Sequence, residues 1–302
     1  MSERYELIDV EKDTLVPTGH KKYTVVTMCE WLDVSNSGYY EWRERPTSVT
    51  ARRRAYLAVL IGTSFADSDE TYGHRRVHAE LARWGARCGT ELVRSIMRAL
   101  GLVAGQPRPW RHSLTDADPG APAIPDLVNR DVTAEAPGVT MVGDITNLPT
   151  WAGWLYVATV IDCHTKEVRG WAMADNYKTP LISAAIRMAA RNHRIAPGAI
   201  FHSDRGSNYT SAEFAETLQD LDVRQSVGRT GVSYDNAMAE SFFAALKNER
   251  VSRTAYPTRE RAQADIARYI EFRYNTKRLH SGLGYKTPME VHTAYLNRLS
   301  AA

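Results

Sequence analysis

Apolar residues recur at helical spacing through the first hundred positions of the chain. Between Tyr23 and Trp42 they predict a helix, a tight turn and a second helix, with Ser35 or Asn36 placed to cap the second. This outline suits either a small DNA-binding unit or a packing hairpin. Positions 1–20 show no clear period, and positions 50–66 predict one longer helix with a basic start.

A stronger helix-turn-helix pattern follows between positions 71 and 105. Gly85 separates two amphipathic faces, and Thr90 is a natural N-cap for the second helix. The arginines of this segment are candidates for contacts to DNA phosphates, with a capping or solvated role as the alternative. They are Arg75 and Arg76 at the entrance, and Arg94 and Arg98 four apart on the second helix.

The pattern changes beyond a proline-rich stretch. Positions 105–125 hold five of the thirteen prolines and predict a linker. After them, the apolar pattern predicts three strands, a helix, a strand, a helix, a strand and a helix. This order describes an α/β fold in which helices flank a mixed sheet. We expect a helical region over 1–104, a linker over 105–128, the α/β core over 129–250, and a C-terminal helix with a basic tail over 251–302.

Three acids of the α/β region suggest a metal site. Asp144 lies in the first strand segment, Asp204 follows a short buried strand, and Glu240 lies on a later helix. Two acids at strand ends and one on a helix are expected to converge at one edge of the sheet. Clustered carboxylates raise one another's pKa values, so such a set makes sense mainly with bound cations. Taken singly, each acid would more often be a turn, cap or surface residue.

The chemistry that fits three carboxylates is phosphodiester cleavage and joining. Two Mg²⁺ ions about 4 Å apart would stabilise both the attacking and the leaving oxygen. We expect Asp144 to bridge the ions, Asp204 to bind one of them and Glu240 the other. Lys247 lies two helical turns after Glu240 on the same face, where it is placed to hold a phosphate.

Other polar residues near these acids carry weaker expectations. Asp162, at the end of the second strand, is expected to be a turn residue rather than a metal ligand. His202 and Ser203 are neighbours on a strand and point to opposite faces, so they cannot belong to one catalytic triad. Arg278 and His280, in the basic tail, are candidates for DNA contact or for support of the acids.

Charge and cysteine content narrow the class of protein. The net charge is +3, but thirteen arginines and no lysines face seven acids between Glu41 and His112, which favours a nucleic-acid surface there. The three cysteines are scattered, which argues against a zinc module or a disulfide framework and fits a reducing cytosol. The polar N-terminus is no signal peptide, and no apolar run approaches the roughly 20 residues of a membrane span.

Several motifs together resemble a known family. GDIT, HSDRGSNYTS and YDNAMAESFFAALKNE, with 35 residues between Asp204 and Glu240, resemble the D-D-E core of retroviral-integrase-like transposases. More narrowly, they resemble the second open reading frame of IS3-family insertion sequences. Lys247 matches the basic residue that these enzymes carry seven positions after the glutamate. The tail FRYNTKRLHSGLGYKTPMEV and the upstream VSNSGYYEWRERP and YGHRRVHAELARWG extend the resemblance from about Thr24 to Val291.

The resemblance implies an RNase H-like fold and a DDE transposase. It implies dependence on Mg²⁺, for which Mn²⁺ is expected to substitute, and cleavage and strand transfer at element ends. In that family one 3′ end joins the opposite end and gives a circular intermediate that later integrates. The implied partners are double-stranded DNA, as terminal inverted repeats and target, and further copies of the chain on that DNA. The implied location is cytoplasmic and nucleoid-associated.

The sequence also departs from the family pattern. Val142 stands where a tryptophan is common, and Val132 where an aromatic residue is common, and both look like packing changes. No heptad run is present, so the helix-turn-helix and leucine-zipper part of the first reading frame is expected from a partner or a fusion. Two alternatives stay open: a metal-dependent nuclease of RNase H type that does not join ends, and an inactive DNA-binding remnant. The intact acids and Lys247 argue against the remnant.

Overall fold

The computed structural model describes residues 2–17, 19–105, 124–129, 131–228 and 237–301. The chain divides into two compact units, Met1–Val59 and Leu60–Ala302. Most of the linker expected over 105–128 lies outside the described residues. None of the helices among those residues is long and apolar enough to cross a membrane.

The first unit is a small helical bundle. Its helices are α1 (Ser2–Glu11), α2 (Val25–Trp31), α3 (Asn36–Glu44) and the first part of α4 (Val49–Asp67). The Ser35 hydroxyl accepts a hydrogen bond from the Gly38 amide at 3.2 Å and caps α3, as predicted. Helix α1 was not expected. Only Tyr5 and Ile8 of this helix are buried, and most of its other residues are polar. The helical period of its apolar residues is therefore too weak to recognise.

The second unit begins with the rest of α4 and two short amphipathic helices. They are α5 (His74–Arg83) and α6 (Thr90–Ala99). Gly85 follows α5 with a φ of +82°, a left-handed conformation that favours glycine and ends the helix. The prediction that Thr90 caps α6 is wrong. Gly89 takes the cap position with no side-chain bond, and Thr90 is already the first helical residue.

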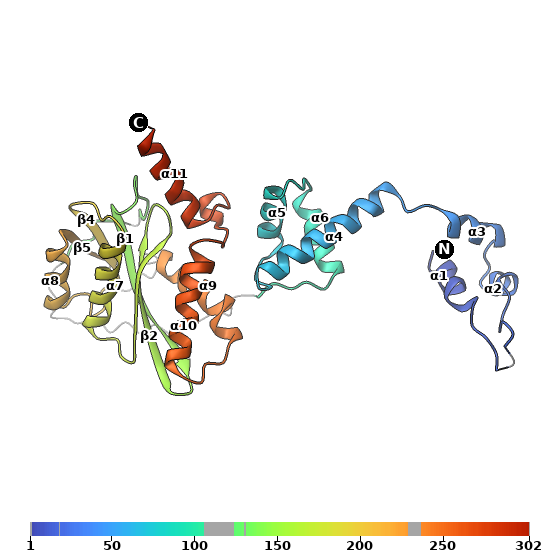
Figure 1. The fold of residues 1–302 in the computed structure, drawn as a ribbon, viewed down its shortest axis with the longest axis horizontal. Coiled ribbons are helices and arrows are strands. Elements are labelled where there is room, and N and C mark those ends of the chain that lie inside the picture. Colours follow the sequence, from blue (N-terminus) through green and yellow to red (C-terminus); the bar gives the residue numbers. More distant parts are fainter. Residues whose placement is uncertain (1, 18, 106–123, 130, 229–236, 302) are drawn as a thin grey trace. The chain divides into compact units, whose positions relative to one another are not determined.

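A five-stranded mixed sheet forms the centre of the second unit (Figure 1). Its strands are β1 (Thr140–Thr150), β2 (Gly153–Asp162), β3 (Val168–Ala174), β4 (Ala199–Ser203) and β5 (Val223–Val227). The order is β3-β2-β1-β4-β5. The first three strands form an antiparallel meander, and β4 and β5 run parallel to β1. The predicted order of strands and helices is confirmed.

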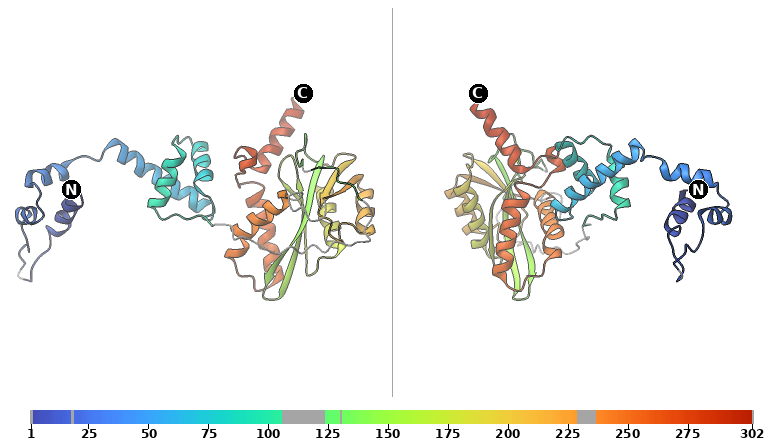
Figure 2. Two further views of the ribbon diagram at one scale, coloured as in Figure 1. Left: turned by 180° about the vertical axis from the view of Figure 1, so that it is seen from behind. Right: turned by 45° about the vertical axis from the view of Figure 1, so that its right-hand side comes forward.

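Helices cover both faces of this sheet (Figures 1 and 2). One face carries α7 (Thr179–Asn192) and α8 (Ala212–Asp220), and the other carries α9 (Ala237–Glu249) and α10 (Arg259–Arg268). Because side chains alternate along a strand, Val142 packs toward α9 while Met141 packs toward α7. Gly143 also faces α7, where a Cβ would come within 2.2 Å of the Phe201 ring.

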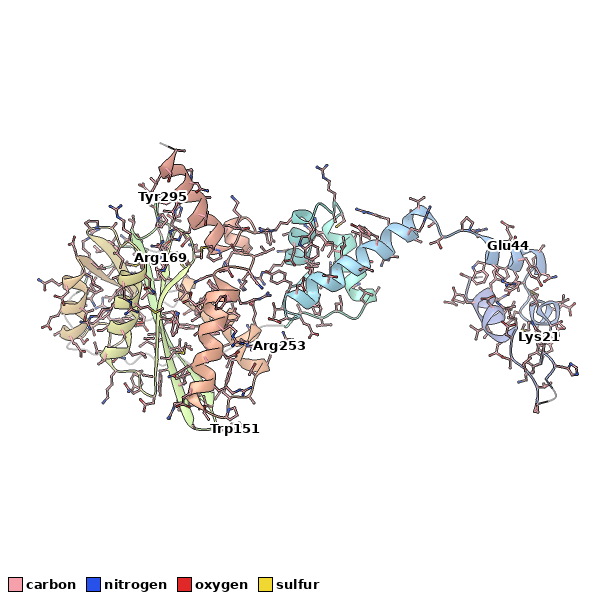
Figure 3. All side chains as sticks on the ribbon, viewed as in Figure 1. Lys21, Glu44, Trp151, Arg169, Arg253 and Tyr295 are labelled. Carbon is pink, nitrogen blue, oxygen red and sulfur yellow. The ribbon has the colours of Figure 1, made fainter. Side chains whose placement is uncertain are left out.

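Past α10 the chain continues as an irregular segment and one last helix. A π-helical stretch, Tyr269–Tyr274, follows α10 directly, and a short 3-10 turn lies at Ser281–Leu283. Another such turn, Val251–Arg253, lies between α9 and α10. The tail also contains α11 (Pro288–Ser300), which begins with a capping box between Thr287 and Glu290. Figure 3 labels Trp151 at the tip of the β1–β2 hairpin and Arg169 inside the core.

Candidate active site

Strand register brings the two aspartates together. Val142 of β1 pairs with His202 of β4 in a parallel ladder, so two residues further along Asp144 lies level with Asp204. Asp144 is two residues from Val142 on the same strand, so its side chain points to the same face of the sheet, toward α9. Asp204 directly follows the last residue of β4. Neighbouring strands are about 4.8 Å apart, which places the two carboxyl groups side by side.

One detail of the expected geometry is wrong. Asp144 does not end its strand, because β1 continues to Thr150 as half of the long hairpin with β2. Only the pairing of β1 with β4 stops before Asp144, so the carboxyl groups meet where β4 ends and β1 runs on. The two acids are fixed locally by backbone amides: Ile145 N donates to Asp144 Oδ1 at 2.8 Å, and Gly206 N donates to Asp204 Oδ1 at 3.1 Å.

Helix α9 supplies the third acid. Its buried side chains, among them Phe242 and Leu246, fix it on the sheet face toward which Asp144 points. Glu240 lies in its first turn, exposed to solvent, and Lys247 lies in its last turn, partly buried. Both charged residues therefore belong to the helix that covers Asp144.

The electrostatics show that these groups interact. Burial, and then the charges of Asp204 and Glu240, raise the pKa of Asp144 to about 8, against the opposing effect of Lys247. Burial and the charge of Asp204 also raise the pKa of Glu240. Burial lowers the pKa of Lys247, and Asp144 opposes that change. Three mutually repelling carboxyl groups beside one amine form a site that favours cations.

Hard divalent cations fit this donor set, because all three side chains offer carboxylate oxygens. Among the described residues, the group whose potential ligand atoms lie within 4.8 Å of one another is a different one, Glu167 with two histidines. Three carboxylates are also a donor set with which two-metal sites hold the attacking and leaving oxygens of a phosphoryl transfer.

The structure reveals one further polar group in the site that sequence reasoning missed. Thr159 of β2 lies opposite Asp144 in the hairpin register, and its buried hydroxyl has no hydrogen-bond partner. Its position in a continuous apolar strand offered no sequence signal. Asp162, by contrast, has the turn role that was predicted. Its buried carboxylate accepts from the Gly138 amide at 2.6 Å and the Thr165 amide at 2.8 Å.

The residues expected to contact DNA divide into two groups. Arg75, Arg94 and Arg98 are exposed on α5 and α6. Arg76, Arg278 and His280 lie instead around the buried carboxylate of Glu249. DNA contact remains a prediction for these six and for Lys247 on α9.

Glu249 was not identified from the sequence, although it closes the motif that carries Glu240. Arg278 donates to its carboxylate at 2.8 Å and 3.0 Å, Tyr269 donates to it at 2.9 Å, and Arg76 lies 3.9 Å away. Burial, and then the Arg278 and Arg76 cations, lower the pKa of His280 to about 3, so its imidazole is neutral. The residues around Glu249 could not predict this contact, because Arg278 lies 29 residues further along the chain.

Family models match both the helical region and the sheet region of the chain. The family model "Integrase core domain" matches residues 134–233, a second model of that description matches 221–288, and "HTH-like domain" matches 51–110. The solved HTLV-2 integrase catalytic core domain in complex with magnesium is 16% identical, with a TM-score of 0.41, over 52% of this chain and 98% of that chain.

Similarity to insertion-sequence proteins extends over nearly the whole chain. The insertion element IS600 uncharacterized 31 kDa protein of Shigella sonnei is 35% identical over 89% of this chain and 98% of its own length. The transposase InsF for insertion sequence IS3A of Escherichia coli (strain K12) is 34% identical over 91% of this chain and 96% of its own length. The chain therefore belongs to the IS3-family transposases, with an HTH-like region ahead of an integrase core.

Proposed function

We propose that this chain catalyses divalent-metal-dependent cleavage and strand transfer at the ends of its own insertion sequence, with Asp144, Asp204 and Glu240 as the metal ligands. The observation that carries the proposal is the register of β1 and β4. It brings Asp144 level with Asp204 on the sheet face covered by α9, where Glu240 lies.

Each residue has a distinct part in this proposal. Asp144 would be the ligand shared by the two ions, while Asp204 and Glu240 would each hold one of them. When bound, Mg²⁺, or Mn²⁺ in its place, neutralises charge on the phosphoryl group and activates the attacking water or DNA 3′-hydroxyl. Lys247 shares this face and provides a cation for a phosphate of the bound strand.

The DNA itself requires a separate surface. The exposed arginines of α5 and α6 supply positive charge for the inverted repeats. For Arg76, Arg278 and His280, DNA contact would require that they leave their present partners. We include in the proposal a homo-oligomer assembled on both element ends, with the upstream-frame product as a separate partner or a fusion.

The test uses purified chain, labelled terminal inverted repeats and Mg²⁺. Joined products support the proposal. Cleavage without joining would indicate a nuclease of RNase H type, and bound but uncut DNA would indicate a DNA-binding remnant. The Glu240→Gln variant should lose at least about a hundredfold in strand transfer, the scale of removing one electrostatic group from a reacting centre. Ser241→Ala, at the exposed neighbouring position on α9, should keep full activity.

A further inference from the structure

A second group of possible metal ligands lies away from the three acids. Glu167 follows the turn between β2 and β3, His193 ends α7, and His292 lies on α11. One potential ligand atom from each lies within 4.8 Å of the other two. His292 Nδ1 is 3.0 Å from Glu167 Oε2, and the two histidine rings are 6.1 Å apart between centroids.

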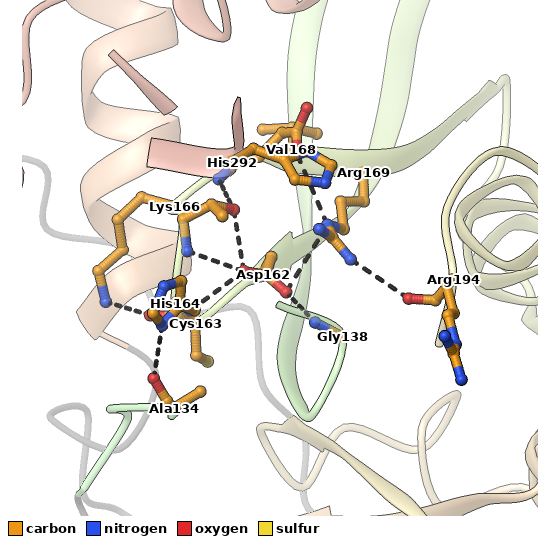
Figure 4. Close-up of polar contacts among 12 residues, drawn as sticks. Ala134, Gly138, Asp162, Cys163, His164, Lys166, Val168, Arg169, Arg194 and His292 are labelled. Atoms are coloured by element: carbon orange, nitrogen blue, oxygen red, sulfur yellow. Dashed lines mark hydrogen bonds and ion pairs between the residues drawn. The ribbon is translucent and has the colours of Figure 1, made fainter. Parts of the chain in front are cut away.

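The charges around Glu167 are unbalanced. The buried side chains here are the carboxylates of Asp162 and Glu167 and a single guanidinium, Arg169. Arg169 Nε lies 3.6 Å from both Asp162 Oδ2 and Glu167 Oε2, as Figure 4 shows for its contact with Asp162. Two buried negative charges against one buried positive charge favour a further cation beside Glu167, either a protonated His292 or a metal ion.

The open side of Glu167 faces the histidines. Glu167 Oε2 is buried, and its contacts are His292 Nδ1 at 3.0 Å and Arg169 Nε at 3.6 Å, whereas the oxygens of Asp162 are satisfied by the Gly138 amide and by the turn around Thr165. The imidazole of His292 is charged only when protonated, so a metal ion bound between it and Glu167 would supply the same positive charge without a proton.

We propose that Glu167, His193 and His292 form a transition-metal site, suited to Zn²⁺, that fastens α11 to the integrase core. Two imidazoles and one carboxylate are the donor set that zinc accepts readily, with a fourth position for water. This set differs from the all-oxygen set of the three acids, which suits Mg²⁺. The inference does not depend on the proposed strand transfer.

A metal at this position would have a structural consequence. Helix α11 buries only Pro288 among its residues, and Leu296 and Leu299 are about half exposed. Its other contacts include the Met289 amide, which donates to the Asn275 carbonyl at 3.0 Å, the Arg83–Glu290 ion pair, and the ring contact between Tyr295 and His164. A bound ion would join the helix to the end of α7 and to the β2–β3 turn, so α11 should be held more firmly when metal is present.

The test is Zn²⁺ binding to the full chain after chelation and removal of the chelator. Calorimetry should find one Zn²⁺ per chain at this site, and His193→Gln and His292→Gln should each weaken binding at least about tenfold. Binding should also protect α11 from limited proteolysis. His164→Gln is the matched control, because His164 contacts α11 but is not one of the three proposed ligands. This variant should bind Zn²⁺ as the wild type does. The absorption spectrum of bound Co²⁺ shows whether its ligands are nitrogen and oxygen atoms or the sulfur atoms of the free cysteines. The Asp144→Asn variant shows whether the proposed catalytic acids contribute to Zn²⁺ binding.

Three results would overturn the proposal: no stoichiometric binding by the wild-type chain, equal binding by the histidine variants, or loss of the site in Asp144→Asn. A stability difference between wild type and His292→Gln that varies with pH, without metal binding, would assign the cluster to a proton-stabilised ion pair instead. Glu167→Gln, checked for its fold by circular dichroism, keeps the test decisive if a histidine variant fails to fold.

Discussion

At the scale of single residues, the apolar pattern predicted the places of Asp204 and Glu240 in the fold, but it wrongly put Asp144 at the end of its strand. Asp204 follows a short buried strand, and Glu240 lies on an amphipathic helix with Lys247 two turns later. The unpaired hydroxyl of Thr159 could not be predicted, since only the register of the β1–β2 hairpin places it beside Asp144. The same holds for Glu167 and its histidines, which are far apart in sequence.

The raised pKa of Asp144 predicts how stability depends on pH. Without metal, the folded chain keeps a proton on Asp144 up to about pH 8, whereas the unfolded chain loses it near the ordinary value of 3.8. The folded state therefore binds more protons between these values, and its stability falls as pH rises through them.

Asp144→Asn removes this titration. In the presence of a chelator, the free energy of unfolding should be compared between the wild type and this variant at each pH. The wild-type value should fall relative to the variant's as the pH rises from about 5 to about 8. Added Mg²⁺ should restore stability to the wild type near pH 8 and do less for the variant, because a bound cation favours the ionised carboxylate. A difference that stays constant across the range would show that Asp144 titrates normally.

At the scale of elements, the helices and strands with strong periods were predicted and those with weak periods were not. Helices α5 and α6 and all five strands follow from apolar spacing. Helix α1 was missed because few of its side chains are buried, and α11 because it is largely exposed. The first residue of α6 was assigned wrongly because Thr90 is a good cap by type, while the backbone turn at Gly89 sets the boundary.

The exposed arginines of α6 should contribute to DNA binding mainly through charge. Replacing Arg94 and Arg98 together with alanine should lower the slope of log affinity against log salt by about 2, one for each lost phosphate contact. Arg191→Ala, an exposed arginine on α7, is the control and should leave the slope unchanged. Equal slopes for the double variant and the wild type would remove α6 from the DNA surface.

At the scale of the second unit, the C-terminal segment joins the HTH-like helices to the integrase core. The Tyr72 hydroxyl accepts from the Leu279 amide at 2.8 Å, and Arg76 Nε donates to the Leu279 carbonyl at 3.0 Å. On its other side, the Asn275 amide group bonds both backbone groups of Val168 in β3 at 3.0 Å. These contacts join residues about 100 to 200 positions apart, so no local pattern in the sequence could predict them.

Glu249 is the charged centre of this junction. Glu249→Ala would leave Arg278 buried without its carboxylate, so we expect a loss of about 3–5 kcal/mol in the free energy of unfolding. Arg83→Ala is the comparison, because it breaks the exposed pair with Glu290 and should cost about 1 kcal/mol or less. Urea unfolding monitored by circular dichroism measures both. Similar losses in the two variants would show that the Glu249 cluster does not stabilise the junction.

Replacing Asp204 tests most directly whether it is a ligand of a catalytic metal ion in strand transfer. Asp204→Cys replaces a hard oxygen ligand with a softer sulfur, which binds Mg²⁺ poorly and Mn²⁺ better. Strand transfer of labelled inverted repeats by this variant should be lost in Mg²⁺ and recovered in part in Mn²⁺, whereas Asp204→Ala should stay inactive in both. Full activity of Asp204→Cys in Mg²⁺, or equal recovery of both variants in Mn²⁺, would show that Asp204 does not bind the catalytic metal ion.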